Sequence, residues 1–254
     1  MSSLLKQVMW TGGWDSTFRV VQLSRIKGIT IQGIYIDDDS RISAEKEINA
    51  INTITELLRR RNETKAEIRP LRIVDKTDIP KNQYITNAYN RIRAEIKIGT
   101  QYDWLARFAY TNPGIELGIE LPDGEFSGCY ETIEHYGGFI KNGDTYKLNL
   151  NKASEDCRAV FGYFEFPLAY TKEATMVEMI KRWGYEDIMG HIWFCHTPYK
   201  GRVCGICRPC EQKMECNMEF LIPRDAQTRY KMMKASKCLF GEKGRDLLYK
   251  VYRF

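Results

Sequence analysis

Two groups of residues in this chain have the types and spacing that chemistry requires. The first is a glycine turn close to the start of the chain, with the sequence Thr11-Gly12-Gly13-Trp14-Asp15-Ser16. The second is a group of four cysteines far downstream, namely Cys195, Cys204, Cys207 and Cys210. Free backbone N–H groups at such a turn can bind an anion, and four thiolates can bind a metal ion.

The glycine turn has the features of a phosphate-binding loop. It follows an apolar run from Leu4 to Trp10, which predicts a strand, and it opens a stretch with helical character from Ser16 to Lys27. Adjacent glycines permit backbone conformations that other residues avoid, and Asp15 and Ser16 suit the N-cap or the first helical turn. Because no lysine follows the glycines, the γ-phosphate grip of a G-x-x-x-x-G-K-[ST] loop is not expected. A plain glycine turn is the alternative interpretation.

The cysteine spacing C-x8-C-x2-C-x2-C predicts a zinc site. Four thiolates at about 2.3 Å close a tetrahedron around Zn²⁺ and leave no open position, so we expect a structural site that lies apart from the chemistry. His191 and His196 flank the first ligand, and either could replace Cys195. A disulfide framework is disfavoured because eight cysteines in 254 residues are too sparse.

Alternating strand and helix patterns predict an α/β fold with a parallel sheet. The expected strands are Leu4–Trp10, Ile29–Ile36, Glu67–Val74 and Ile115–Leu121. The expected helices are Ser16–Lys27, Ala44–Arg61, Tyr102–Tyr110, Pro167–Trp183 with Thr171 as its cap, and Ala226–Lys237. Residues 114–143 are rich in glycine, and we expect an irregular insertion there, with hairpins as one form of it.

Three aspartates, residues 37–39, follow the second expected strand. Ligands of parallel α/β sheets bind outside the carboxyl ends of the strands, so Asp37 is a candidate to hold a ribose or a magnesium ion. A solvated acidic turn explains the same residues equally well.

Composition and charge limit the classes of protein to consider. The chain is 43% hydrophobic, which supplies a sizeable core, yet no apolar stretch reaches the ~20 residues that cross a bilayer. We therefore expect a cytoplasmic protein without a membrane partner. The formal net charge is +5, and basic residues gather in 59–61 and 224–253. Solvated helix faces are the default interpretation of both clusters, with a nucleic-acid or partner surface as the alternative for the second.

Together the two motifs resemble those of the 7-cyano-7-deazaguanine synthase family, within the ATP pyrophosphatase-loop (PP-loop) superfamily. The glycine turn matches the S-G-G-x-D-S loop of these enzymes, with Thr11 in place of the usual serine. The further matches are Pro167-Leu168, Thr171-Lys172-Glu173-Ala174, Trp193-Phe194-Cys195 and Cys204-Gly205-Ile206-Cys207-Arg208-Pro209-Cys210.

This resemblance implies a Rossmann-like parallel sheet of the adenine nucleotide alpha hydrolase-like type. The resemblance covers roughly Lys6 to Phe220, and it implies an ATP-binding domain over residues 1–185 and a four-cysteine zinc region over 186–220. The basic helical extension over 221–254 is an addition to the family's pattern. The resemblance also implies ATP with Mg²⁺, structural Zn²⁺, and an assembly that allows a homodimer.

The implied reaction is the adenylation of a 7-deazaguanine-type carboxylate, with release of pyrophosphate. Ammonia then displaces AMP to form an amide, and a second activation gives a nitrile. The N–H groups of Gly12, Gly13 and Asp15 and the Ser16 hydroxyl would hold pyrophosphate, so Asp15 and Ser16 are the catalytic candidates. Lys172 is a third candidate, although a first-turn surface lysine is the slightly favoured interpretation of it.

The chain departs from this family where the substrate binds. The Asp-Tyr-Gly-Gln-Arg stretch of the family is replaced by residues 37–41, which read DDDSR, and its substrate loop is reduced to Ser127-Gly128-Cys129-Tyr130. This predicts a rebuilt substrate pocket, with a protein or peptide amine as an alternative nucleophile, or an amide as the end product.

Two other hypotheses belong to different classes. A zinc-dependent nucleic-acid-binding module without catalysis explains the positive charge but leaves the glycine turn unexplained. A tRNA-thiolating relative requires a cysteine pair near the nucleotide, for which Cys129 with Cys157 is the weak candidate.

Overall fold

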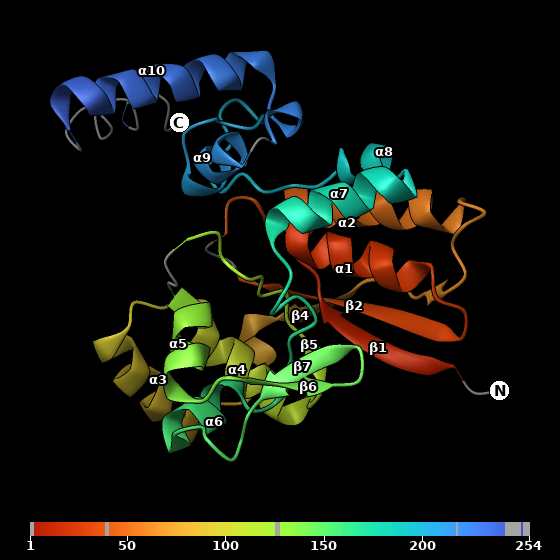
Figure 1. The fold of residues 1–254 in the computed structure, drawn as a ribbon, viewed down its shortest axis with the longest axis vertical. Coiled ribbons are helices and arrows are strands. Elements are labelled where there is room, and N and C mark those ends of the chain that lie inside the picture. Colours follow the sequence, from red (N-terminus) through yellow and green to blue (C-terminus); the bar gives the residue numbers. More distant parts are fainter. Residues whose placement is uncertain (1–2, 39–40, 125–127, 217, 242–249, 251–254) are drawn as a thin grey trace.

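The computed structural model describes residues 3–38, 41–124, 128–216, 218–241 and 250 (Figure 1). Its centre is a parallel sheet with the strand order β3-β2-β1-β5-β8, in which β4 also pairs with β2. The strands are β1 (Leu4–Met9), β2 (Ile29–Asp37), β3 (Glu67–Ile68), β4 (Arg72–Asp75), β5 (Ile115–Glu116) and β8 (Phe164–Glu165). The expected α/β class with a parallel sheet is therefore confirmed.

Helices cover both faces of the sheet, and each face has its own core cluster. One face carries α1 (Trp14–Ser24), α2 (Ala44–Arg59), α7 (Glu173–Trp183) and α8 (Glu186–Met189). The other carries α3 (Gln83–Glu95), α4 (Gln101–Thr111), α5 (Gly128–Tyr136) and α6 (Glu155–Phe161), with an antiparallel hairpin of β6 (Phe139–Asn142) and β7 (Thr145–Leu148). Among the described residues, no helix is both long and apolar enough to cross a membrane.

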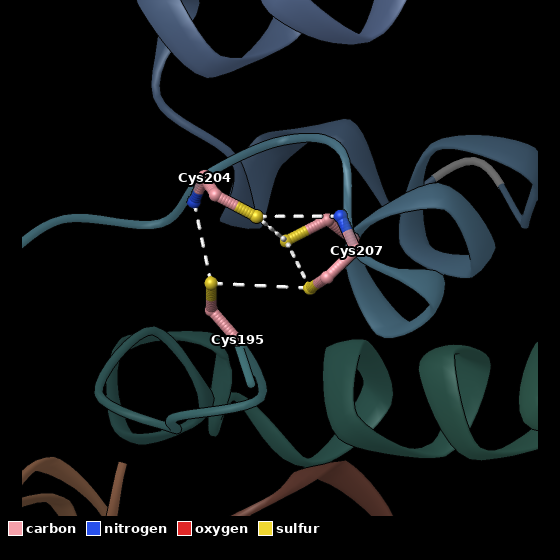
Figure 2. Close-up of side chains that lie close together, drawn as sticks. Cys195, Cys204 and Cys207 are labelled. Carbon is pink, nitrogen blue, oxygen red and sulfur yellow. Dashed lines mark hydrogen bonds between the residues drawn. The ribbon is translucent and has the colours of Figure 1, made fainter. Parts of the chain in front are cut away.

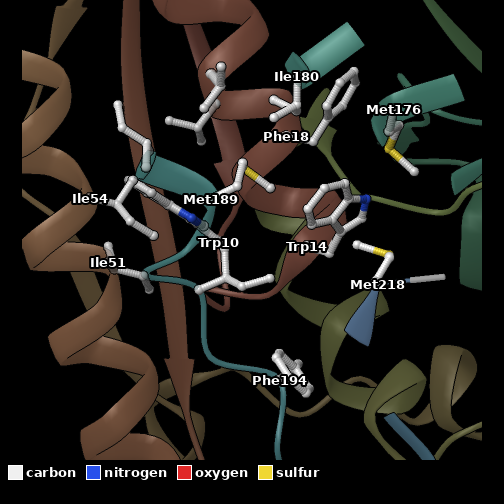
Figure 3. Close-up of a cluster of buried hydrophobic side chains, with 14 of the residues drawn as sticks. Trp10, Trp14, Phe18, Ile51, Ile54, Met176, Ile180, Met189, Phe194 and Met218 are labelled. Carbon is white, nitrogen blue, oxygen red and sulfur yellow. The ribbon is translucent and has the colours of Figure 1, made fainter. Parts of the chain in front are cut away.

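The cysteine segment lies next to the first of these two faces and leads into α9 (Arg208–Glu215) and α10 (Arg224–Phe240). Short 3-10 turns occur at Lys76–Asp78 and Glu219–Leu221. Phe194 and Met218 belong to the same core cluster as Trp10 and Trp14, as Figure 3 shows. The cysteine segment therefore shares its core with the α/β sheet.

Several elements differ from the sequence-based expectation. The strand expected over residues 67–74 is divided into β3 and β4, because Pro70 has no N–H group for the ladder. The helix expected from Pro167 begins only at Glu173, and its N-cap is Lys172 and not Thr171. Thr171 belongs instead to a turn in which its N–H donates to the carbonyl of Leu168. The insertion expected over residues 114–143 does contain the first strand of a hairpin, but it also contains α5. The helices α3, α5 and α6 were not expected from the sequence.

Candidate functional site

The glycine turn connects the carboxyl end of β1 to the start of α1, as expected. Gly12 has a φ of +71°, and a Cβ there would lie 2.9 Å from the carbonyl oxygen of Glu47, so only glycine fits. Gly13 is instead the extended N-cap of α1, with a φ of −79°. The N–H of Thr11 donates to Ser16 Oγ over 3.4 Å and closes the turn. The free N–H groups of the first α1 turn thus face the edge of the sheet where ligands bind.

A cavity of about 270 Å³ opens beside this turn. We call it the loop cavity, because the glycine turn forms one of its sides. Its apolar and aromatic walls come from Met9, Ile34, Ile36, Tyr102, Trp104, Leu105 and Leu117. Its polar groups come from Thr11, Asp15, Ser16, Arg41, Gln101 and His196. Apolar walls with a few converging polar groups are typical of a small-molecule site.

A second cavity of about 210 Å³, the polar cavity, is also lined by Asp15. It shares Thr11, Gly13, Trp14, Asp15, Arg41 and His196 with the loop cavity. Its further lining residues are Glu47, Glu120, Trp193, Phe194, Pro209, Gln212 and Lys213. The glycine turn therefore stands where two cavities meet, and one ligand can reach into both.

Arg41 faces both cavities because a buried carboxylate holds it there. Glu47 is only 4% exposed and accepts hydrogen bonds from Tyr35 Oη, Ser43 Oγ and Arg41 over 2.9, 2.7 and 2.9 Å respectively. Burial lowers the pKa of the Arg41 guanidinium, but the Glu47 carboxylate and the Tyr35 side chain together more than offset this, so the net shift is upward. Arg41 is thus a fixed positive charge beside the glycine turn.

Asp15, two further carboxyl groups and one lysine form a buried group at the glycine turn. Lys213 bonds to Glu173, and its Nζ lies 5.4 Å from the centre of the Trp14 ring. The side-chain oxygens Asp15 Oδ1, Glu120 Oε2 and Glu173 Oε2 are buried without hydrogen-bond partners. Such orphaned oxygens are expensive in a folded protein, and they are expected where a ligand completes the site.

Burial sets the protonation of two members of this group. It raises the pKa of Asp15 to about 6, although Lys213 opposes the shift, and Glu173 adds to it. Burial also raises the pKa of Glu120 to about 9, and the charges of Asp15 and Glu173 act in the same direction. At neutral pH Asp15 is mostly ionised and Glu120 mostly neutral. Perturbed carboxyl groups of this kind, in a cavity, are typical of functional sites.

The four cysteines come together as expected, and all four are buried. Figure 2 shows the sulfur atoms, which all lie within 4.8 Å of one another, with separations of 3.3 Å for Cys207–Cys210, 3.8 Å for Cys204–Cys210 and 3.9 Å for Cys195–Cys207. A tetrahedron with metal–sulfur bonds of 2.3 Å places its sulfurs about 3.8 Å apart. The geometry therefore fits one metal ion bound by four thiolates, whereas a [4Fe–4S] cluster would distribute them over separate iron atoms.

The cysteine segment lies against the glycine turn, whereas we expected the metal site to lie apart from the chemistry. Cys207 is the N-cap of α9, and Lys213 of the same helix lines the polar cavity. The next residue after Cys195 is His196, which lines both cavities. The N–H of Trp193 also donates to the carbonyl of Gly12 over 2.8 Å. The cysteine segment is thus bonded to the glycine turn and forms one wall of the site.

Other residues expected at the site lie outside both cavities. Asp37 ends β2 and lines neither, and Asp39 and Ser127 are outside the described residues. Lys172 pairs with Asp123 over 3.1 Å, is half exposed, and is likewise not among the lining residues.

Cys129 and Cys157 do not line either cavity. Burial raises the pKa of the Cys157 thiol to about 12, and the pKa of Cys129 moves in the same direction for the same reason. Because a nucleophilic cysteine must be a thiolate, this pair does not suit the thiolation hypothesis.

The sequence did not predict Arg41, Glu120 or Lys213 as site residues, and it offered His196 only as an alternative metal ligand. Arg41 had a signal, because it matches the arginine of the Asp-Tyr-Gly-Gln-Arg stretch. Glu120 and Lys213 are isolated residues whose role depends on packing.

Comparisons with known proteins do not assign this chain to a family. No family model matches it, and no curated protein matches it. One solved structure with partial similarity is the U34-tRNA thiolase NcsA from Methanococcus maripaludis with its [4Fe-4S] cluster. The two chains share 11% identity over 99% of this chain and 72% of that chain, with a TM-score of 0.43. At this level of similarity, neither fold nor function is carried over from the thiolase.

Proposed function

We propose that this protein is an ATP-dependent ligase that adenylates a carboxylate substrate, releases pyrophosphate, and transfers the acyl group to a nitrogen nucleophile. The observation that carries this proposal is the lysine-free glycine turn at the point where the loop cavity and the polar cavity meet. A loop without the P-loop lysine lacks the positive charge that contacts the β- and γ-phosphates in P-loop enzymes that transfer the γ-phosphoryl group. Cleavage between the α- and β-phosphates is therefore the favoured outcome.

The two cavities divide the reactants between them. The loop cavity suits adenosine, because Tyr102 and Trp104 offer aromatic surface for a base. The α-phosphate would then lie beside Asp15, with the pyrophosphate on the N–H groups of the first α1 turn. The substrate carboxylate attacks the α-phosphorus, and the bond to pyrophosphate breaks. Arg41 and Lys213 supply positive charge for this step.

The residues present fit both expected metal ions. Mg²⁺ usually takes one or two carboxylates together with substrate phosphates, and Asp15 Oδ1 is a buried oxygen that still needs a partner. Bound there, Mg²⁺ would neutralise phosphate charge. The four thiolates fit Zn²⁺ as a structural ion that orders α9.

A 7-deazaguanine-type carboxylate is the substrate that we propose for the polar cavity. Trp14, Trp193 and Phe194 line it and offer aromatic faces to a planar bicyclic ring. The carboxyl groups of Glu47 and Glu120 lie in the same lining and suit the N–H donors on the edge of a guanine-like base. The resemblance to 7-cyano-7-deazaguanine synthases motivates this choice.

Product analysis tests the proposal. The protein is incubated with ATP, Mg²⁺, 7-carboxy-7-deazaguanine and ammonium chloride, and the products are separated by chromatography and mass spectrometry. AMP and pyrophosphate are expected in equal amounts, together with an amide or a nitrile. ADP and inorganic phosphate would refute α–β cleavage, and AMP formation that does not depend on the carboxylate would refute adenylation of this substrate.

A further inference from the structure

The positive charge of this chain is concentrated after Cys195. Residues 196–254 contain 13 lysines and arginines against 6 aspartates and glutamates, whereas residues 1–195 contain 25 against 27. The formal net charge of +5 therefore arises entirely from the part of the chain that contains α10 and most of the cysteine segment. A charge asymmetry of this kind between two parts of a chain indicates association with a partner of opposite charge.

Three of these cations form one line along α10. Arg224, Lys231 and Lys234 are separated by seven and three residues, so they lie on the same face of this helix, and all three are exposed. We call these three residues the basic stripe. The stripe starts in the first turn of α10 and extends over about 15 Å of helix. No aspartate or glutamate occurs between residues 226 and 241 to offset its charge.

The cysteine segment holds α10 in the orientation that exposes the stripe. Arg229 Nε and Nη2 donate to the carbonyl oxygens of Cys204 and Val203 over 2.8 and 3.0 Å respectively. Gly205 packs so closely that a Cβ there would lie 2.1 Å from the carbonyl oxygen of Ala226. These contacts fix the inner face of α10 on the cysteine segment, at the end of the molecule beyond α9 (Figure 1). The basic stripe therefore faces away from the protein.

The charge of the stripe is not neutralised by neighbouring acids. Arg229, on the inner face of α10, pairs with Asp225 over 2.9 Å. In the part of the chain that the structure describes, by contrast, no carboxylate lies within ion-pair distance of the stripe. Arg224 also lies in the first turn of α10, where the positive end of the helix dipole disfavours a cation and attracts an anion. This face thus suits an anionic partner.

We propose that the basic stripe binds the phosphodiester backbone of a nucleic acid. The phosphates of one strand of a duplex follow each other at about 3.4 Å along the axis, so about 15 Å of helix faces several of them. Lysine and arginine contacts to phosphates position a protein but do not identify bases, so we expect binding that is independent of sequence. This inference goes beyond the proposed function and does not depend on it.

Other occupants of this face fit less well. A membrane needs a free apolar helix face, and the apolar face of α10, with Ala226, Tyr230 and Met233, is buried in the protein. A second copy paired symmetrically through the stripe would bring like charges together. The end of this chain does not supply the missing negative charge, because residues 242–254 contain four cations and two acids. A nucleic acid brings a negative charge at every unit of its backbone.

Fluorescence anisotropy of the metal-loaded, full-length protein tests the stripe directly. The probes are fluorescein-labelled oligouridine RNA, oligothymidine DNA and a mixed-sequence duplex DNA, each about 20 nucleotides long, at about 50 to 200 mM NaCl. All binding should weaken as salt rises. Three phosphate contacts predict a slope of log K against log salt of at least about −2 for the single strands and about −3 for the duplex.

Removing the charge of the stripe gives the main comparison. Arg224→Gln, Lys231→Gln and Lys234→Gln, combined in one protein, are expected to weaken binding at low salt by at least about tenfold. They should also make the salt slope for the single strands shallower by about 2, which a change in fold alone would not do. Because the three side chains are exposed, the melting temperature and the metal content should match those of the wild type.

The matched control removes the same charge elsewhere. It combines Lys27→Gln, Lys65→Gln and Lys81→Gln, which change exposed lysines of the α/β region, and it should bind nucleic acid nearly as the wild type does. Equal weakening by the two triple variants would overturn the proposal, because net charge alone would then explain the binding. Absence of binding to all three probes at the lowest salt would overturn it as well.

Two further measurements assign the face to another partner if the proposal fails. Sedimentation with phosphatidylserine vesicles that depends on the stripe, in place of nucleic-acid binding, would overturn the proposal in favour of a membrane. Dimerisation in light scattering that the stripe variant loses would overturn it in favour of a second copy. Stripe-dependent binding of RNA or DNA supports the proposal, and the probe that binds more tightly identifies the kind of nucleic acid.

Discussion

The glycine turn and the cysteine segment contribute to one site by different physical means. The turn acts through its own backbone, and six adjacent residues contain the whole signal. The cysteine segment acts through residues that its ligands position, because Cys207 starts α9 and α9 carries Lys213 into the polar cavity. A motif that works locally can thus be interpreted from sequence. A motif whose effect is to place other residues becomes clear only when the fold is known.

The largest effect should come from removing the metal site. Cys207→Ser is expected to release the metal, lower the melting temperature and abolish AMP formation, since metal binding contributes folding free energy on the order of 10 kcal/mol in zinc domains. Cys238→Ser is the matched control, because Cys238 is exposed and outside the cluster. Elemental analysis, thermal unfolding and AMP release are measured together. A stable Cys207→Ser protein with full turnover would show that the cysteine segment does not support the site.

Asp15→Asn should separate function from stability. Loss of the carboxylate is expected to slow AMP formation by at least ~10²-fold, because it removes an interaction at the reacting phosphate. The same change removes a buried charge, so the free energy of unfolding at about pH 8 is expected to rise by roughly 1–3 kcal/mol. Asp78→Asn, at an exposed position, is the control. An inactive variant that is also less stable would contradict the interpretation that the Asp15 charge serves function at a cost to the stability of the fold.

The pH dependence of this difference follows from the raised pKa of Asp15. Burial raises this pKa to about 6, above the value of about 4 in the unfolded chain, so the folded protein prefers the protonated form. Asp15 therefore costs no stability below about pH 4, and the cost develops between about pH 4 and about pH 6 and is complete above that. Urea unfolding is measured for wild type and Asp15→Asn at several pH values. The difference between their free energies of unfolding is expected to grow over this pH range. A difference that does not change with pH would contradict the raised pKa of Asp15.

Much of the fold and part of the site could be predicted from sequence. The strands β1 and β2 and the helix α2 have long periodic patterns, and the cysteine spacing specifies the metal ligands. The two-residue strands β5 and β8 have too little sequence to carry a pattern, and their pairing depends on the sheet. Glu120 and Lys213 have no motif of their own, because their roles arise from burial among residues distant in the chain.

Lys213 allows a finer test of how the two regions cooperate. Lys213→Met is expected to raise the KM for ATP by about tenfold or more, whereas Lys213→Arg should recover part of the loss because it keeps the charge. Metal content should stay unchanged, since the cysteines are intact. Lys231→Met, on the exposed face of α10, is the control.

Removing Lys213 also leaves the buried carboxylate of Glu173 unpaired. The double variant Lys213→Met with Glu173→Gln has no unpaired buried charge, so it separates an effect on ATP binding from a loss of stability. If this double variant is stable and binds ATP as wild type does, Lys213 has no part in nucleotide binding.

The smallest effect is expected from Lys172. Its ion pair with Asp123 is half exposed, and such pairs contribute about 0–1 kcal/mol. Lys172→Ala should therefore change the rate of AMP formation by less than about twofold. A loss of tenfold or more would return Lys172 to the catalytic residues and would require a movement of α7 toward the glycine turn.

The central claim is that the glycine turn and the cysteine segment hold one nucleotide between them. A crystal structure of the metal-loaded protein with α,β-methylene-ATP and Mg²⁺ tests it most directly, because this analogue cannot be cleaved between the α- and β-phosphates. We predict the base in the loop cavity, the phosphates on the N–H groups of Gly13 and Asp15, and Lys213 within hydrogen-bond distance of a phosphate oxygen. A nucleotide bound elsewhere, or one whose phosphates contact neither the glycine turn nor any residue of the cysteine segment and α9, would contradict the account.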